Sequence, residues 1–133
     1  MDAPRRPNDR IRVLIADDQP LFAKMLVSIL AGDERVEVVG QAANGREAVE
    51  LATALVPDVI VMDISMPLMD GLEATRRLRE ANASSRILML TESDLPGDLR
   101  RSQQAGADGY LSKTRIASDL RQSIVNVAAR SAL

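Results

Sequence analysis

Apolar runs of strand length alternate with segments of helical periodicity along most of this chain. Five short runs, rich in Ile, Val and Leu, have the composition of strands that are buried on both faces of a sheet. They span residues 11–16, 36–40, 59–62, 87–90 and 109–111. Alternation of such strands with helices is typical of βαβ units, so the pattern predicts an α/β protein with a parallel sheet.

Helical periodicity fills the gaps between the runs and follows the last of them. In the first gap, Pro20 is placed for a first helical turn and Gly32 for the end of the helix. Apolar residues between them repeat at the spacing of one helical face: Phe22, Met25, Leu26, Ile29 and Leu30. Ser118 is expected to cap the last of four further helices, which are predicted over residues 48–55, 72–78, 97–105 and 120–127.

Composition narrows the chemistry that this chain can perform. Its 133 residues are about one domain, and 46% hydrophobic with 27% charged residues is ordinary for a globular protein. The absence of Cys excludes disulfides and thiolate metal sites, and the absence of His excludes histidine catalysis and histidine metal ligands. Any chemistry therefore depends on Asp, Glu, Lys, Ser or Thr.

Charge and hydropathy bear on partners and location. Seventeen basic and nineteen acidic residues give a net charge of −2, so there is no overall basic field for nucleic acid or an anionic membrane. Residues 1–10 hold two prolines and five charged residues, and we expect them to form a flexible N-terminal tail. No apolar run has the length of a signal or membrane segment, which favours a cytoplasmic protein.

Unusual polar residues follow four of the five predicted strands. Asp17 and Asp18 come directly after the first strand and Asp63 after the third, while Thr91 and Lys113 belong to the ends of the fourth and fifth. In an open parallel α/β sheet, ligands bind beyond the carboxyl ends of the strands. The sequence therefore predicts that these side chains share one site.

The residue types at this site suit phosphoryl transfer. Carboxylates packed together repel one another unless a cation neutralises them, and an all-oxygen ligand set suits Mg²⁺ better than a softer metal. Lys113 and the Thr91 hydroxyl could bind anionic oxygens. Asp63 would then be the nucleophile that forms an acyl phosphate.

Four motifs in order connect these residues to a known family. They are ADD at residues 16–18, DISMPLMDG at 63–71, LT at 90–91 and GADGYLSK at 106–113. Together they resemble the receiver domain of bacterial two-component response regulators. The resemblance covers residues 11–130 and is strongest to the subfamily with a LuxR-type helix-turn-helix output domain.

The resemblance implies a fold and a metal site. The fold would be flavodoxin-like, a doubly wound five-stranded parallel sheet in the order 2-1-3-4-5 with five helices. Asp63 matches the family's phospho-acceptor, Asp18 its direct Mg²⁺ ligand and Asp17 a ligand that acts through water. The backbone carbonyl of Ser65 matches the remaining protein ligand, so Mg²⁺ is the implied cofactor.

The resemblance also implies which residues hold the phosphoryl group and respond to it. Lys113 matches the lysine that contacts the group, and the backbone N–H groups of Ile64 and Glu92 match those that bind its oxygens. Thr91 and Tyr110 match the pair of residues that rearranges on phosphorylation.

Three departures from the family pattern stand out. Thr114 follows the lysine where proline is usual, and Glu92 follows the switch threonine where a small or apolar residue is usual. An output domain would need on the order of 60 further residues beyond 131–133. The resemblance therefore leaves open whether the chain is a fragment of a regulator or a stand-alone receiver.

The expected function is a phosphorylation-dependent signalling switch. A sensor histidine kinase would donate the phosphoryl group to Asp63, and the change would alter homodimerisation or partner binding, with control of transcription through an output domain. The chain would catalyse only its own phosphorylation and dephosphorylation. A stand-alone phosphorelay receiver is the alternative. An aspartyl-nucleophile phosphohydrolase is disfavoured because Ser65 stands where that class has a second Asp.

Simpler roles exist for each residue considered alone. Asp17 and Asp18 could cap the first helix, and Asp63 could be an ordinary turn residue. Lys113 could be a solvated lysine, and Tyr110 could be a core residue. It is the common register of these residues at one sheet edge that favours the functional interpretation.

Overall fold

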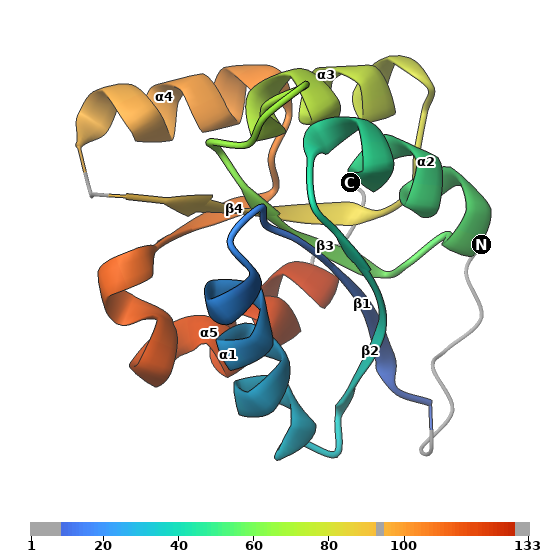
Figure 1. Cartoon of the computed structure of the whole chain (residues 1–133), viewed down its shortest axis with the longest axis vertical. Coiled ribbons are helices and arrows are strands. Elements are labelled where there is room, and N and C mark those ends of the chain that lie inside the picture. Colours follow the sequence, from blue (N-terminus) through green and yellow to red (C-terminus); the bar gives the residue numbers. More distant parts are fainter. Residues whose placement is uncertain (1–8, 93–94, 130–133) are drawn as a thin grey trace.

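The computed structural model describes residues 9–92 and 95–129 and has the predicted α/β architecture. Its five strands form one parallel sheet in the order β2-β1-β3-β4-β5, which confirms the flavodoxin-like topology (Figure 1). The strands are β1 (Ile11–Ala16), β2 (Val36–Ala42), β3 (Val59–Asp63), β4 (Arg86–Thr91) and β5 (Gly109–Ser112). The helices are α1 (Pro20–Ala31), α2 (Gly45–Leu55), α3 (Gly71–Glu80), α4 (Pro96–Ala105) and α5 (Ile116–Ala128).

Helices cover both faces of the sheet. Helices α2, α3 and α4 lie on one face, and α1 and α5 lie on the other (Figure 1). Successive residues of a strand point to opposite faces, so Val13 and Ile15 belong to the core under α1 and α5, whereas Leu14 and Ala16 belong to the core under α2 and α3. This two-sided burial explains why the strands are continuous apolar runs.

The helix that ends the chain begins differently from its prediction. A short 3-10 turn, Lys113–Arg115, precedes α5, and the helix starts at Ile116 with Arg115 at the N-cap position. Ser118 therefore lies within the first turn of α5, where its hydroxyl donates to the Arg115 carbonyl at 3.3 Å. The prediction of Ser118 as the cap was wrong because Ile116, four residues before Leu120 and buried like it, already belongs to the helix.

Element ends depart from the predictions by one to three residues elsewhere, and the largest of these differences is the start of α2 at Gly45, three residues before the predicted start. Strand β2 continues two residues past the predicted Gly40, and β4 and β5 each extend to the polar residue that follows the apolar run. The predicted tail lies mostly outside the described residues, and the described part begins with exposed Asp9 and Arg10. Among the described helices, none combines the length and apolar character needed to cross a membrane.

The edge of the sheet where the strands begin, its amino-terminal edge, carries acidic residues that accept hydrogen bonds from neighbouring elements. Asp108, just before β5, accepts hydrogen bonds from the Arg79 guanidinium at 2.5 Å and from the Ile87 N–H at 2.8 Å. Asp58, just before β3, accepts from the Arg12 N–H at 2.8 Å. These carboxylates connect strands and helices at the edge opposite to the predicted site.

Candidate phosphoryl-transfer site

Three carboxylates converge at the carboxyl end of the sheet, as the sequence predicted. Strands β1 and β3 are hydrogen-bonded neighbours with Ala16 opposite Met62, so Asp17 and Asp63 leave the sheet side by side. Carboxylate oxygens of Asp17, Asp18 and Asp63 lie within 4.8 Å of one another. Asp17 and Asp63 are buried, with 4% and 2% of their surface exposed, while Asp18 is the most exposed of the three.

Asp17 has one satisfied and one unsatisfied oxygen. Its Oδ1 accepts the Gln19 N–H at 2.9 Å, and Gln19 rather than Asp17 occupies the N-cap position of α1. Its Oδ2 is buried without a hydrogen bond and lies 3.8 Å from the Lys113 ammonium. One oxygen of Asp17, Oδ1, therefore supports the start of α1, and the other, Oδ2, belongs to the carboxylate cluster.

The surroundings of Asp63 disfavour its ionised form. Its Oδ2 accepts from the Lys113 ammonium at 3.1 Å, and its Oδ1 accepts weakly from the Ser65 N–H at 3.4 Å. Burial raises the pKa of the Asp63 carboxyl from 3.8 to about 6, with the Asp17 charge acting in the same direction, although the contact with Lys113 opposes both. A further cation would favour the ionised form of this carboxylate.

Lys113 is surrounded by four residues from other parts of the chain. Besides Asp63 and Asp17, its ammonium contacts Glu92 Oε1 at 3.1 Å and lies 4.6 Å from the centre of the Phe22 ring. Burial would lower the pKa of Lys113, but its contacts with Asp63, Glu92 and Asp17 outweigh burial and raise that pKa. Lys113 is thus held charged beside Asp63 and is not an ordinary solvated lysine. Two of these contacts were not predicted. The helical periodicity assigned Phe22 to the core, and the contact between Glu92 and Lys113 depends on side-chain conformation.

The loop after Asp63 is held in place by close backbone contacts. The Gly71 N–H donates to the Ile64 carbonyl at 2.7 Å, and the Gly45 N–H donates to the Met69 carbonyl at 2.8 Å. A Cβ at Gly71 would lie 2.1 Å from the Asp63 carbonyl oxygen, so a larger residue there would displace the acceptor residue itself. The two glycines therefore serve to position Asp63 and its loop.

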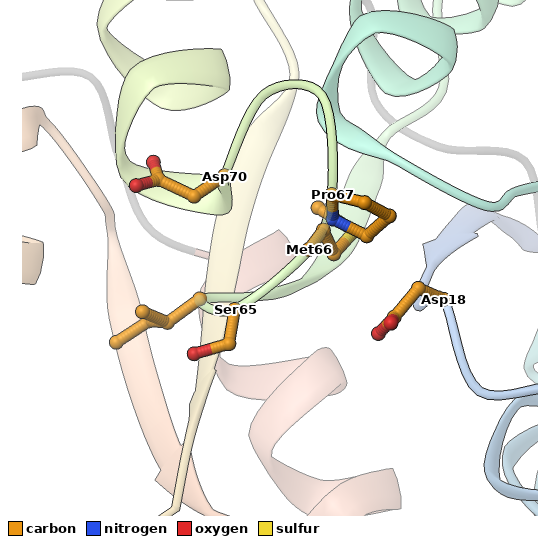
Figure 2. A pocket seen from close by; sticks show the side chains of 6 residues that line it. Asp18, Ser65, Met66, Pro67 and Asp70 are labelled. Atoms are coloured by element: carbon orange, nitrogen blue, oxygen red, sulfur yellow. The ribbon is translucent and has the colours of Figure 1, made fainter.

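An open pocket of about 490 Å³ lies between Asp18 and this loop. Figure 2 shows the Asp18 carboxylate pointing from the end of β1 toward Ser65 and Met66, while the Asp70 carboxylate turns away. Asp70 instead caps α3, where it accepts the Glu73 N–H at 2.8 Å. Asp18 thus connects the pocket with the carboxylate cluster, because it lines the one and belongs to the other.

One expected phosphoryl contact is engaged elsewhere in this structure. The Ile64 N–H, implied by the resemblance to bind phosphoryl oxygens, donates to the Leu90 carbonyl at 3.2 Å as part of the approach of β3 to β4. The Ser65 N–H is the group directed at the Asp63 carboxylate. Ser65 therefore offers an N–H to the acceptor as well as the carbonyl that was predicted.

The predicted switch residues lie on the same face of the sheet but differ in burial. Thr91 ends β4 and is fully buried, whereas Tyr110 on β5 is 40% exposed. Met89 pairs with Tyr110 and Thr91 with Ser112, so Thr91 and Tyr110 both project toward the α4 side. Thr114, found where proline is usual, bonds to the Ser112 hydroxyl at 2.9 Å through its own hydroxyl.

The cluster fits a hard divalent cation. All its donor atoms are carboxylate oxygens, one of which, Asp17 Oδ2, is buried without a hydrogen-bond donor, and the pocket beside Asp18 has room for water ligands. The Lys113 ammonium is 3.8 Å from this oxygen, beyond hydrogen-bond distance, and a buried carboxylate oxygen without a hydrogen bond is costly. The three carboxylates therefore have the donor chemistry and spacing of a site for such a cation.

Comparisons with known proteins identify the family of this chain. Residues 13–125 match the response regulator receiver domain family. The chain is 37% identical to the nitrate/nitrite response regulator protein NarL of Escherichia coli over 88% of this chain and 54% of the relative, and 39% identical to the chemotaxis protein CheY of Halobacterium salinarum over 77% and 83%. A crystal structure of a LuxR-family two-component response regulator from Aurantimonas superposes with a TM-score of 0.86 at 30% identity, covering 91% and 86% of the two chains.

The extent of these matches bears on the whole protein. The chain spans 58% and 54% of the length of two nitrate/nitrite response regulator relatives. The family match, by contrast, covers nearly all of the sheet and its helices. This chain belongs to the response regulator receiver domain family, with NarL-like transcriptional regulators among its relatives.

Proposed function

We propose that Asp63 accepts a phosphoryl group from a sensor histidine kinase and that this protein is the switch of a two-component system. The observation that carries the proposal is the buried Asp63 carboxylate, set between Asp17, Asp18 and the Lys113 ammonium. In the transfer, an Asp63 oxygen forms a bond to phosphorus while the bond from phosphorus to the histidine nitrogen breaks. The imidazole leaves and the Asp63 acyl phosphate remains.

The chain's own residues position the reacting groups. Lys113 would neutralise oxygens beside Asp63, and the Ser65 and Glu92 N–H groups would donate to the new phosphoryl oxygens, a role that the Ser65 N–H contact with the Asp63 carboxylate supports. Asp18, Asp63 and the Ser65 carbonyl would hold Mg²⁺, with Asp17 acting through water. The ion would neutralise negative charge on the carboxylates and on the phosphoryl group.

Transmission of the signal would pass through Thr91 and Tyr110. The Thr91 hydroxyl would bond a phosphoryl oxygen, and Tyr110 would turn inward from its half-exposed position. The altered α4-β5-α5 face would then favour a homodimer or another partner. The NarL-like relatives favour a cytoplasmic transcription regulator with an output domain, while a stand-alone relay module, supported by the CheY relative, is the second candidate.

Intact-mass measurement with a small phosphodonor tests the central step. Incubation with acetyl phosphate and Mg²⁺ should add one phosphoryl group to the wild type, and EDTA should prevent the addition. The Asp63→Asn variant should stay unmodified. Phosphorylation that persists undiminished in that variant would refute Asp63 as the acceptor.

A further inference from the structure

Lys113 has a partner that the proposed transfer does not use. The Glu92 carboxylate contacts its ammonium at 3.1 Å, the same distance as the Asp63 carboxylate. The lysine side chain is 12% exposed, whereas the Glu92 side chain is 69% exposed. Glu92 thus reaches from the solvent side onto a sheltered lysine in the centre of the site.

We propose that Glu92 is a positioning residue that occupies Lys113 before phosphorylation and competes with the incoming phosphoryl group for it. This inference rests on the proposed function, because it assigns a role to Glu92 in the same phosphoryl-binding site. The family resemblance gave a role only to the Glu92 backbone N–H. The ion pair instead assigns a role to its side chain.

The number of donors on the ammonium makes the two anions rivals. Lys113 has three N–H donors, and two are directed at Asp63 and Glu92 while Phe22 and Asp17 occupy further neighbouring space. A phosphoryl group on Asp63 would bring new anionic oxygens next to this ammonium. Glu92 carries a like charge, so the phosphoryl group must displace it or bind beside it at an electrostatic cost.

Burial indicates which of the two partners gives way. Asp63 is 2% exposed and fixed at the end of β3, whereas the Glu92 carboxylate can return to water at little cost. Among the described acidic residues, the carboxylate cluster within 4.8 Å comprises Asp17, Asp18 and Asp63, so Glu92 is not placed as a fourth metal ligand. Competition for Lys113 is the role that remains for its side chain.

Beryllofluoride binding provides the direct test, since this ion mimics a phosphoryl group on a carboxylate. With Mg²⁺ at low salt, the Glu92→Gln variant should bind beryllofluoride about two- to fivefold more tightly than wild type, which is the range for losing one exposed ion pair. The matched control is Glu34→Gln, which removes an equally negative, exposed residue at the other end of the sheet and should leave the affinity unchanged. At high salt the gain in Glu92→Gln should shrink.

Two further measurements separate competition for Lys113 from a general change in charge. In a Lys113→Gln background, the additional Glu92→Gln substitution should no longer alter beryllofluoride affinity. The ammonium NMR signal of Lys113 should shift in Glu92→Gln without any phosphoryl mimic and should not shift in Glu34→Gln. A merely structural role for Glu92 would move neither quantity in this way.

The outcomes are distinguishable. If wild type binds beryllofluoride but Glu92→Gln binds it equally or more weakly, the competition is refuted while the proposed function stands. An affinity gain that persists undiminished without Lys113 also refutes it. A wild type that neither binds beryllofluoride nor accepts a phosphoryl group would overturn the proposed function itself.

Discussion

Acidic residues lie at both ends of the parallel strands, the amino-terminal edge and the carboxyl-terminal edge of the sheet. The partners of these residues differ between the two edges. At the amino-terminal edge, Asp108 in the loop before β5 accepts hydrogen bonds from the Arg79 guanidinium of α3 and from the Ile87 N–H of β4. At the carboxyl-terminal edge, Asp17 has an oxygen without a hydrogen bond, and Asp63 shares one lysine with two other carboxylates. The first arrangement stabilises the fold, while the second leaves free energy available to ligands.

The pKa values of one carboxyl group at each edge, Asp33 and Asp63, differ in the same way. The Arg35 side chain and backbone N–H lower the pKa of Asp33, in the loop after α1, to about 2. Burial raises the pKa of Asp63 to about 6. Within one small domain, ionisation of a carboxyl group is therefore favoured by folding at one edge and opposed by folding at the other.

Removal of Asp108 should have the largest effect on stability. The Asp108→Ala variant leaves the Arg79 guanidinium and the Ile87 N–H without this acceptor, and should lower the free energy of unfolding by about 2–3 kcal/mol. Urea denaturation gives the measurement. The control is Glu80→Gln, which changes an exposed residue next to Arg79 on α3 and should change stability little. Equal effects of the two variants would contradict a structural role for the amino-terminal edge.

Removal of Asp63 should act in the opposite direction. Because the folded-state pKa of about 6 lies above the ordinary 3.8, ionisation of Asp63 reduces stability as the pH rises from about 4 through 6. In EDTA at pH 7.5, Asp63→Asn should therefore be more stable than wild type by about 2 kcal/mol. Below pH 4 the difference should vanish. A less stable Asn variant at pH 7.5 would show that Asp63 is a structural residue like Asp108.

A bound metal should reduce the contrast between the edges. At Mg²⁺ concentrations tenfold above the dissociation constant, binding to the folded state should stabilise wild type by about 1.4 kcal/mol. Asp18→Asn should abolish this gain, since Asp18 is the predicted direct ligand, while Asp108→Ala should retain it. Thermal denaturation with and without Mg²⁺ measures both. An undiminished gain in Asp18→Asn would place the ion elsewhere.

The smallest effect is expected at Asp33. Its folded pKa lies below the ordinary value, so the stability from its contact with Arg35 is present above pH 4 and is lost as the pH falls toward 2. Asp33→Asn should be slightly less stable than wild type at pH 7, and the difference should disappear only as the pH falls below about 2. NMR titration of the carboxyl carbons should place the Asp33 midpoint about four pH units below that of Asp63.

Sequence reasoning predicted the carboxyl-terminal edge better than the amino-terminal edge. Asp17, Asp63 and Lys113 lie at the carboxyl ends of buried strands, so the strand order implied by the family resemblance was enough to bring them together. Asp108 and Arg79 are 29 residues apart on different elements, and no periodicity indicates that such a pair will meet. The Glu92 contact with Lys113 likewise depends on side-chain conformation. The start of α5 was missed because Ser118 was chosen as the cap, whereas the 3-10 turn at Lys113–Arg115 leads directly into the helix at Ile116.

Tyr110 also gives the molecule a natural optical label. The chain has one tyrosine and no tryptophan, so excitation at a wavelength that its one phenylalanine does not absorb gives emission from a single side chain. That side chain is 40% exposed on β5, where its phenol ring samples water. If phosphorylation turns the ring inward, quenching by an added solute such as iodide should decrease without the attachment of any dye. The proposed rearrangement can thus be followed in real time on the unmodified protein.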